Sequence, residues 1–128
     1  MLRLSGFFAT LAIASLLSAP SLAAGDIAKG KKVFNKCKAC HVADTEKHRI
    51  GPHLVGMFGR KAGSLEKFKY SKAMKNSSVV WSAETLDTYL KKPSAFIKGT
   101  RMAFAGLKKD QERADLIAYL QSVTQPKK

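Results

Sequence analysis

Two cysteines and a histidine stand within one short run, Cys37-Lys38-Ala39-Cys40-His41. A Cys-x-x-Cys-His run is typical of covalent attachment of a c-type haem. Two thiols three positions apart share one side of a helical turn, where they can add to the two vinyl groups on one edge of a haem. The imidazole that follows is then carried under the ring, and a neutral histidine nitrogen is a good iron ligand. The run therefore predicts one covalently bound haem.

Three other interpretations of this run are open from the residues alone. A thioredoxin-like redox pair fits Cys-x-x-Cys, but no strand pattern precedes it. Zinc could be bound by the two thiolates, His41 and either His48 or His53, which make a plausible tetrahedral set. The third interpretation is chance. Haem is favoured because the preceding segment indicates export, and covalent haem attachment in bacteria takes place outside the cytoplasm.

Residues 1–24 have the pattern of a secretory signal peptide. Arg3 supplies the positive start, residues 4–17 are mostly apolar, and small residues precede an expected cleavage after Ala24 or Ala23. The apolar run is shorter than the roughly 20 residues that a membrane-spanning helix needs. An uncleaved membrane anchor is the alternative. The sequence thus predicts a signal peptide at 1–24, a single domain at 25–128 and a periplasmic location.

The chain is strongly basic, with a formal net charge of +14, to which the predicted signal peptide contributes only Arg3. An exported protein rarely meets nucleic acid, so the charge predicts attraction to an acidic protein surface or an anionic membrane face. A domain this small buries a low fraction of its surface. A large apolar cofactor would enlarge its core.

Helices must position these residues, because the periodic segments of the chain all have helical spacing. Asp26 is expected to cap a first helix with Gly30, Val33 and Phe34 on one face. The later helices are expected as a short turn at 71–75, a helix capped by Ser82 and ended by Pro93, and a last helix capped by Asp110. The 42–69 stretch is glycine-rich and irregular, which is typical of a functional loop. The predicted fold class is all-α.

A haem held by one histidine needs a second group on its other face. The candidates are Met57, Met74, Met102, His48, His53 and water, and periodicity does not choose among them. Met102 gains ground because it lies in an irregular stretch between helices, far along the chain from His41. From such a loop it could approach the opposite face of the ring.

Several blocks beyond the haem run make the chain resemble a class I cytochrome c of the mitochondrial and periplasmic bacterial type. The resemblance extends from about Gly25 to Ser122. It is carried by Gly-Lys-Lys-Val-Phe-x-x-Cys-x-x-Cys-His at 30–41, Gly-Pro-His-Leu-x-Gly-x-Phe-Gly-Arg-Lys-x-Gly at 51–63, Trp81 with Glu84-Thr85-Leu86, Gly-Thr-Arg-Met-x-Phe-Ala-Gly at 99–106, and Asp-Leu-Ile-Ala-Tyr-Leu at 115–120.

The resemblance implies a small cytochrome c fold in which the N- and C-terminal helices cross and enclose one haem c. It gives Cys37 and Cys40 the two thioether bonds, His41 the proximal iron bond and Met102 the distal one. The other roles that it implies are a carbonyl from Pro52 to the far nitrogen of His41, propionate contacts from Arg60, Tyr70, Asn76 and Trp81, a lining of the methionine side by Tyr89 and Thr100, and contact of Gly30 and Phe34 with the last helix near Leu116 and Tyr119.

The resemblance also implies a function, that of a soluble monomeric electron carrier rather than an enzyme. The expected partners are acidic docking sites on membrane redox complexes, with quinol–cytochrome c oxidoreductase as donor and a terminal oxidase or photosynthetic reaction centre as acceptor. The lysines expected to ring the exposed haem edge are Lys36, Lys38, Lys92, Lys98 and Lys109. The alternatives are a haem enzyme with an open distal site, such as a weak peroxidase, and a Cys/His zinc module.

Two positions depart from the family pattern. Lys98 stands where mitochondrial relatives place a proline before the Gly-Thr-x-Met run, and His53 stands where relatives often have asparagine. The first departure predicts a looser Met102 loop.

Overall fold

The computed structural model describes residues 24–128, in which helices are joined by long loops. The predicted signal peptide therefore lies almost wholly outside the described residues. Within 24–128 the secondary structure consists of α1 (Ile27–Phe34), α2 (Lys72–Lys75), α3 (Ala83–Lys91), α4 (Pro93–Phe96) and α5 (Asp110–Val123), with one isolated bridge between Lys61 and Val80 and no strand. The predicted all-α class is confirmed. No helix in this part of the chain has the length and apolar character that crossing a membrane requires.

Side-chain caps set the beginnings of the first three helices, and the two that the sequence predicted there, Asp26 and Ser82, are confirmed. The carboxylate of Asp26 accepts a hydrogen bond from the Lys29 N–H at 2.8 Å. Ser71 caps α2 in the same way, and Ser82 and Thr85 form a reciprocal capping box at α3. Such caps satisfy backbone donors that have no partner inside the helix.

One predicted helix start was wrong, whereas the predicted end of α3 is confirmed. The N-cap of α5 is Lys109, and Asp110 is the first helical residue, because its carboxylate pairs with the Arg113 side chain instead of capping the backbone. Pro93 does end α3, but it also begins α4, where its fixed φ and missing N–H suit the first turn. The short α4 was not predicted.

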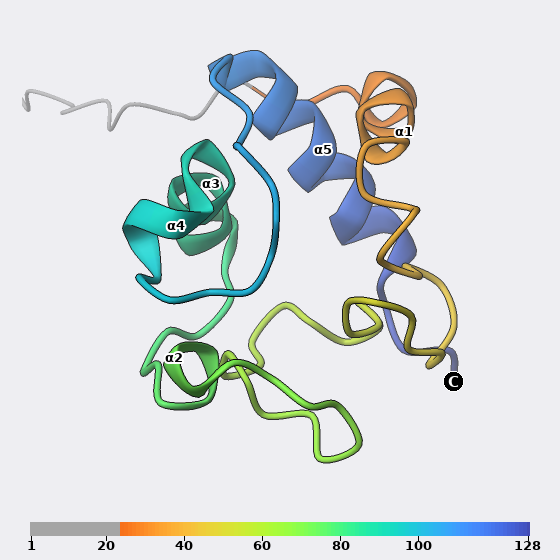
Figure 1. Cartoon of the computed structure of the whole chain (residues 1–128). Helices are drawn as coiled ribbons and strands as arrows, with labels where there is room; N and C mark the ends of the chain where they lie inside the picture. The colour runs from red at the N-terminus through yellow and green to blue at the C-terminus, as the bar shows by residue number, and fades with distance from the viewer. Residues whose placement is uncertain (1–23) are drawn as a thin grey trace, which may run out of the picture.

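The first and last helices, α1 and α5, cross and pack against each other (Figure 1). A side chain at Gly30 would collide with the carbonyl oxygen of Asp115 and come within 2.7 Å of Tyr119 Cβ. The rings of Phe34 and Tyr119 pack 5.5 Å apart, centroid to centroid. The predicted contact of Gly30 and Phe34 with the last helix is confirmed, and it explains a glycine inside a helix.

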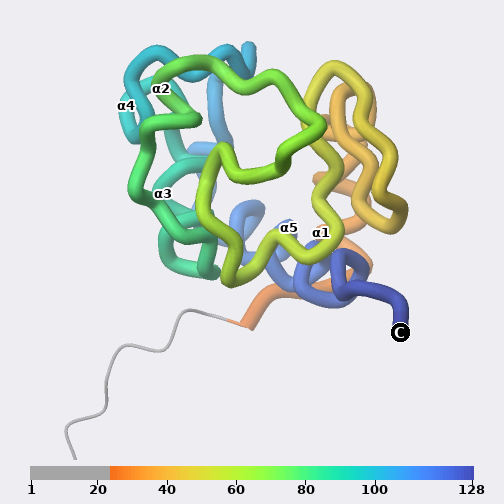
Figure 2. The backbone as a smooth tube through the Cα atoms, turned by 90° about the horizontal axis from the view of Figure 1, so that it is seen from below, coloured from red at the N-terminus to blue at the C-terminus, as the bar shows by residue number. Residues whose placement is uncertain are grey.

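The core lies between α1, α3 and α5, and its buried side chains include Val33, Phe34, Leu86, Leu90, Leu116, Ile117 and Leu120. The long segment between α1 and α2 runs around the rim of the molecule, from the side of α1 to the side of α3 and α4 (Figure 2). Backbone hydrogen bonds tie this segment down at intervals, such as Leu54 N–H to Val42 O at 2.9 Å and Ala62 N–H to Val79 O at 2.8 Å. The helices therefore form one side of the domain and the loops wrap the other.

Candidate functional site

The Cys-x-x-Cys-His run continues directly from the end of α1 in tight, helix-like turns. Cys37 N–H donates to Phe34 O at 2.8 Å, and His41 N–H donates to Cys37 O at 2.9 Å. Both cysteines are free thiols and partly buried. The turns keep the two thiols and the imidazole close together on one short stretch. This suits the motif, in which the two cysteines hold one edge of a haem and the histidine lies at one face.

The His41 ring is held from two sides. Its Nδ1 lies 2.7 Å from the carbonyl oxygen of Pro52. A carbonyl only accepts, so Nδ1 carries the proton and Nε2 keeps a free lone pair. Burial lowers the pKa of His41, although the hydrogen bond to Pro52 opposes this shift. The imidazole is therefore neutral, oriented and ready to bind a metal through Nε2.

Gly51 lets the backbone pass against this ring. A Cβ at Gly51 would collide with Cε1 of His41 and lie 2.8 Å from Nδ1, and its N–H donates to Cys40 O at 2.8 Å. The sequence analysis did not give Gly51 a role. The available signal was its place directly before Pro52, whose carbonyl was predicted to accept a hydrogen bond from His41.

The thiol of Cys37 is not activated for redox chemistry. Burial raises its pKa to about 11, although the charge of Lys36 opposes the shift. Reactive cysteines need a lowered pKa because the thiolate is the nucleophile. A thioredoxin-like pair is therefore not supported by this site.

The geometry does not support the zinc interpretation either. Within residues 24–128 no three or more His, Cys, Asp or Glu side chains are grouped as a metal site. The rings of His48 and His53 instead stack on each other, with centroids 4.9 Å apart, and the Nδ1 of His48 accepts the His53 backbone N–H at 3.2 Å. Nδ1 of His53 is buried with no hydrogen-bond partner in this part of the chain.

Met102 lies in a second cluster with Tyr89 and Thr100. The Tyr89 hydroxyl donates to the sulfur of Met102 at 3.7 Å and lies 3.3 Å from the Thr100 hydroxyl. The Met102 N–H donates to that same Thr100 oxygen at 3.4 Å. Burial raises the pKa of Tyr89, although the Thr100 hydrogen bond opposes the shift, so the phenol keeps its proton and remains a donor. One sulfur lone pair is thus fixed, which orients the other.

A third cluster contains Arg60, Tyr70 and Trp81. Arg60 and Trp81 are joined through their backbones, with Trp81 N–H donating to Arg60 O at 3.0 Å. The Arg60 guanidinium donates to Val55 O at 2.7 Å. Burial raises the pKa of Tyr70 while its Leu65 backbone hydrogen bond and the nearby Arg60 charge oppose the shift. The phenol therefore keeps its proton, and both it and the Arg60 guanidinium can donate to a carboxylate.

The clusters are connected, and one predicted residue stands apart from them. The rings of Trp81 and Tyr89 lie 5.0 Å apart, so the Arg60 cluster adjoins the Met102 cluster. Asn76, by contrast, is exposed at the C-terminal cap of α2, where its backbone N–H bonds to Lys72 O and Met74 O. Its predicted propionate contact stays a prediction that this geometry does not support.

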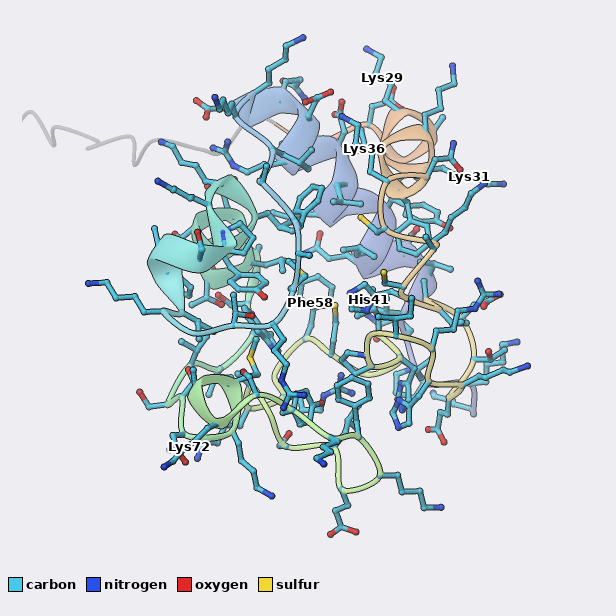
Figure 3. All side chains as sticks on the ribbon, in the orientation of Figure 1. Lys29, Lys31, Lys36, His41, Phe58 and Lys72 are labelled. Atoms are coloured by element: carbon cyan, nitrogen blue, oxygen red, sulfur yellow. The ribbon has the colours of Figure 1, made fainter. Side chains whose placement is uncertain are left out.

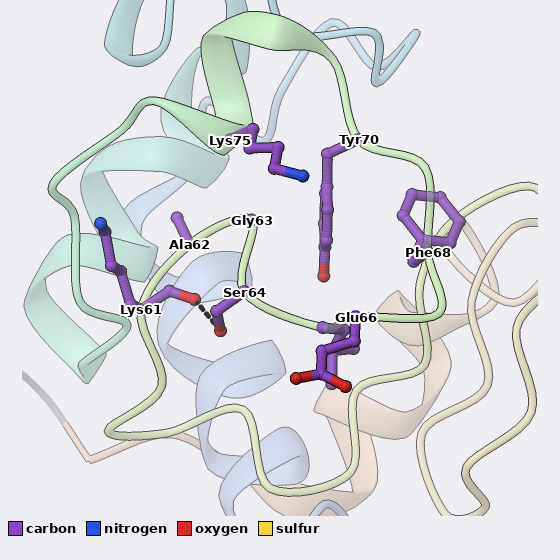
Figure 4. Close-up of a pocket in the computed structure, with 9 residues that line it drawn as sticks. Lys61, Ala62, Gly63, Ser64, Glu66, Phe68, Tyr70 and Lys75 are labelled. Atoms are coloured by element: carbon purple, nitrogen blue, oxygen red, sulfur yellow. Dashed lines mark hydrogen bonds between the residues drawn. The ribbon is translucent and has the colours of Figure 1, made fainter.

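A small pocket of about 260 Å³ lies beside Tyr70. Figure 4 shows Lys75 reaching toward Tyr70 and the Tyr70 hydroxyl pointing toward the Ser64 and Glu66 side. The hydroxyl of Ser64 donates to Lys61 O at 2.6 Å and closes the turn. The pocket is polar and mixed in charge, so it extends the Arg60 cluster as a polar rim.

The side chains between these clusters suit the faces of a haem. Several partly buried apolar groups pack against the core together with Met102, namely Cys37, Leu54, Phe58, Met74, Trp81, Phe96 and Phe104. His41 and Phe58 lie in the middle of the view in Figure 3, whereas the labelled lysines lie at its margins. The apolar lining suits the two faces of a haem, and the polar rim suits its propionates. The neutral imidazole of His41 and the sulfur of Met102, each oriented by a hydrogen bond, suit its iron. The residues therefore fit the group.

Comparison with known proteins gives the same answer. The sequence model of the family described as Cytochrome c matches residues 27–124. The chain belongs to the cytochrome c family. It is 52% identical over 103 residues to the cytochrome c type-1 of Ascaris suum, covering 80% of this chain and 92% of that protein. It is 50% identical over 113 residues to the cytochrome c2 of Rhodomicrobium vannielii, covering 88% and 90% respectively.

Membership gives this cytochrome c its cofactor and its general activity. It carries a single haem c, bound covalently through two thioethers, and it is an electron carrier that exchanges electrons with redox partners. The predicted family, fold and cofactor are confirmed. The roles of individual residues and the identity of the partners go further than this comparison.

Proposed function

We propose that this cytochrome c carries single electrons between membrane-bound redox complexes in the periplasm, after removal of a signal peptide at about Ala24. The observation that carries the assignment is the pair of oriented donors, His41 Nε2 freed by the Pro52 hydrogen bond and Met102 sulfur held by Tyr89. Such a pair suits the two axial positions of one iron. The similarity to a cytochrome c2 supports the location.

In this proposal Cys37 and Cys40 form the thioethers, and His41 and Met102 bind the iron on opposite faces. When bound, the haem supplies a one-electron couple between ferric and ferrous iron, and methionine ligation raises its potential. Arg60, Tyr70 and Trp81 stabilise the propionates by donating to them. Tyr89 and Thr100 hold the methionine sulfur, and the apolar lining excludes water.

With both axial positions filled by protein, the iron cannot readily bind a substrate, so the protein is a carrier and not an enzyme. An absorption spectrum of the purified, exported protein tests this proposal. We expect a low-spin haem with the weak methionine–iron band near the red end of the spectrum. A high-spin ferric spectrum would instead support a haem enzyme with an open distal site.

The proposed partners are acidic docking sites on a quinol–cytochrome c oxidoreductase and on a terminal oxidase or photosynthetic reaction centre, approached by a monomer. The support is charge, because the net charge is +14 and Lys38, Lys92, Lys98 and Lys109 are all exposed. Lys36 is exposed too, but its amine lies 3.6 Å from the Glu112 carboxylate, which offsets part of its charge. Docking therefore depends more on the other four.

A further inference from the structure

The segment that carries Met102 is anchored at both ends. It leaves α4 at Gly99, whose φ of +91° suits only glycine well, and Thr100 N–H donates to Ile97 O at 3.1 Å. It returns at Leu107, which is 2% exposed and whose N–H donates to Leu90 O at 2.8 Å. The position of Met102 therefore depends on two attachment points, and the second leads into α5.

Arg113 holds the second attachment point from inside the protein. The residue is only 3% exposed, and its Nη1 donates to Leu107 O at 2.8 Å and to Lys108 O at 3.1 Å. These are the carbonyls of consecutive residues at the end of the Met102 segment. A single guanidinium nitrogen thus fixes the direction in which the chain enters α5.

Two carboxylates hold the guanidinium in turn. Nε donates to Asp87 Oδ1 at 2.7 Å and Nη2 donates to Asp110 Oδ1 at 2.5 Å. Burial acts to lower the pKa of Arg113, but the hydrogen bonds and charges of Asp87 and Asp110 raise it overall. The group stays cationic and bridges α3, the loop end and α5. Lysine lacks this planar fork of donors and cannot reproduce the geometry.

The loop end also has little room to adjust. Gly106 has a φ of +104°, and a Cβ there would collide with the carbonyl oxygen of Lys91 at the end of α3. Only residues 103–105 separate Gly106 from Met102, and Phe104 N–H donates back to Met102 O at 3.0 Å. A shift of the Leu107 and Lys108 carbonyls should therefore move Met102 as well, because the segment between them is short and constrained.

We propose that Arg113 is a positioning residue for Met102, which it keeps on the iron by locking the end of the loop to α3 and α5. This inference rests on the proposed function, in which Met102 is the distal ligand. Within residues 24–128 the Arg113 side chain makes no hydrogen bond to Met102; its partners are Asp87, Leu107, Lys108 and Asp110. It acts by limiting how often the loop opens and withdraws the sulfur.

An added ligand measures this opening directly. Cyanide can bind the ferric iron only in molecules whose distal position is open, so its apparent dissociation constant falls in proportion as the open fraction rises. A variant that weakens the lock tightens cyanide binding, even if its closed form is unchanged. Global unfolding is measured separately with guanidinium chloride on the same holoprotein.

The experiment compares Arg113→Lys and Asp87→Asn with Phe34→Leu, all as ferric holoproteins. Phe34→Leu weakens the α1–α5 crossing, away from the loop, and controls for loss of overall stability. We expect Arg113→Lys to tighten cyanide binding by about tenfold, the effect of losing one typical net hydrogen bond. Asp87→Asn, which keeps an oxygen for Nε but loses the charge, should tighten it about threefold and remains informative if Arg113→Lys fails to fold. Phe34→Leu should leave cyanide affinity within about twofold of wild type.

The outcomes separate the inference from the proposal beneath it. If the wild-type protein lacks the methionine–iron band, the distal assignment of Met102 fails, and the role of Arg113 fails with it. If the band is present but Arg113→Lys and Asp87→Asn bind cyanide no more tightly than Phe34→Leu at equal stability, only the positioning role is overturned. Tighter binding in the two lock variants alone supports it.

Discussion

The carbonyl oxygen of Asp115 occupies the space that a side chain on Gly30 would need. The two helices meet backbone to backbone at this point, and the carboxylate of Asp115 also accepts the Asp26 N–H at 2.8 Å. Asp115 thus contacts α1 both at its N-cap, Asp26, and in its middle, at Gly30. We therefore expect this close fit to tolerate neither a larger side chain at Gly30 nor loss of the charge of Asp115.

Adding one methyl group at this crossing should destabilise the whole protein. Gly30→Ala gains roughly 1 kcal/mol of helix propensity, but the new Cβ must push against the Asp115 carbonyl and against Tyr119 Cβ at 2.7 Å. Overpacking of this kind typically costs about 1–3 kcal/mol. Because the new Cβ meets a backbone oxygen, we expect a cost at the upper end of this range and, after the gain in helix propensity, a net loss of about 2 kcal/mol in the free energy of unfolding. Guanidinium chloride titration of the holoprotein measures it. The exposed Lys32→Ala on the same helix should change stability by less than about 0.5 kcal/mol, and equal effects of the two changes would contradict the close fit.

Acid should weaken the same crossing through Asp115. The Asp26 N–H and then Gln111 donate to this carboxylate, which lowers its pKa although burial opposes the shift. The stabilisation is therefore fully present above the unfolded pKa of roughly 3.9 and is lost as the pH falls through the lower, folded pKa.

Asp115→Asn tests this dependence. The variant should melt at a lower temperature than wild type near neutral pH, and the difference should narrow as the pH falls toward the acid limit. Melting temperature against pH is the measurement, with exposed Asp44→Asn as the matched control for the loss of one negative charge. A difference that is constant with pH would show that the carboxylate charge has no part in the crossing.

Replacing Met102 should change the spectrum and chemistry of the iron. Met102→Ala removes the sulfur that Tyr89 holds, so the methionine–iron band should vanish, the potential should fall and cyanide should bind readily. Met57 is 4% exposed in the core and Met74 packs against it, so Met57→Ala and Met74→Ala should keep the band. Loss of the band in Met57→Ala with retention in Met102→Ala would reverse the assignment.

The helices could be read from the sequence because their determinants are local. Asp26, Ser71 and Ser82 each bond to a backbone N–H three residues later, and such a cap needs only the neighbouring chain. Asp110 failed as a cap because its carboxylate pairs instead with Arg113, three residues later in the same helix, whose side chain is buried. Nothing in the spacing of apolar residues signals that an arginine in the last helix is buried.

The sequence predicts the iron ligands, whose assignment stays a proposal, but it does not predict some of the contacts that hold the surrounding loops. The Cys-x-x-Cys-His run and the blocks around Pro52, Arg60 and Met102 are contiguous patterns, and resemblance to a family carries them. The bond from Arg101 Nη2 to Tyr70 O at 2.6 Å joins two loops 31 positions apart, and no local pattern reports such a pairing. Asn76 was assigned by resemblance alone, and it is exposed in the structure.

Salt should slow the reaction with membrane partners, because steering by charge depends on ionic strength. Steered association raises on-rates by roughly 10 to 1,000-fold, and the Debye length shrinks to about 8 Å at physiological ionic strength. We expect the second-order rate of oxidation by a membrane oxidase to fall markedly between low and high salt.

Single lysines can be compared in the same assay. Charge reversal at exposed Lys38 or Lys98 should slow oxidation more than the same change at Lys127 or Lys128 in the C-terminal tail. Lys36 should have a smaller effect than Lys38, because Glu112 already lies 3.6 Å from its amine. Equal losses from tail and loop variants would indicate that net charge alone matters and that no docking face exists.

The crossing of α1 and α5 also orders events during biosynthesis. Asp26 and Asp115 are 89 positions apart, and a chain leaves the ribosome with its N-terminus first. The first helix therefore emerges long before the surface against which it packs exists, and an isolated helix of 8 residues is too short to persist in water. During that interval Cys37, Cys40 and His41 belong to an unfolded segment and are accessible for haem attachment. The domain can enclose its haem only after the last helix has been synthesised.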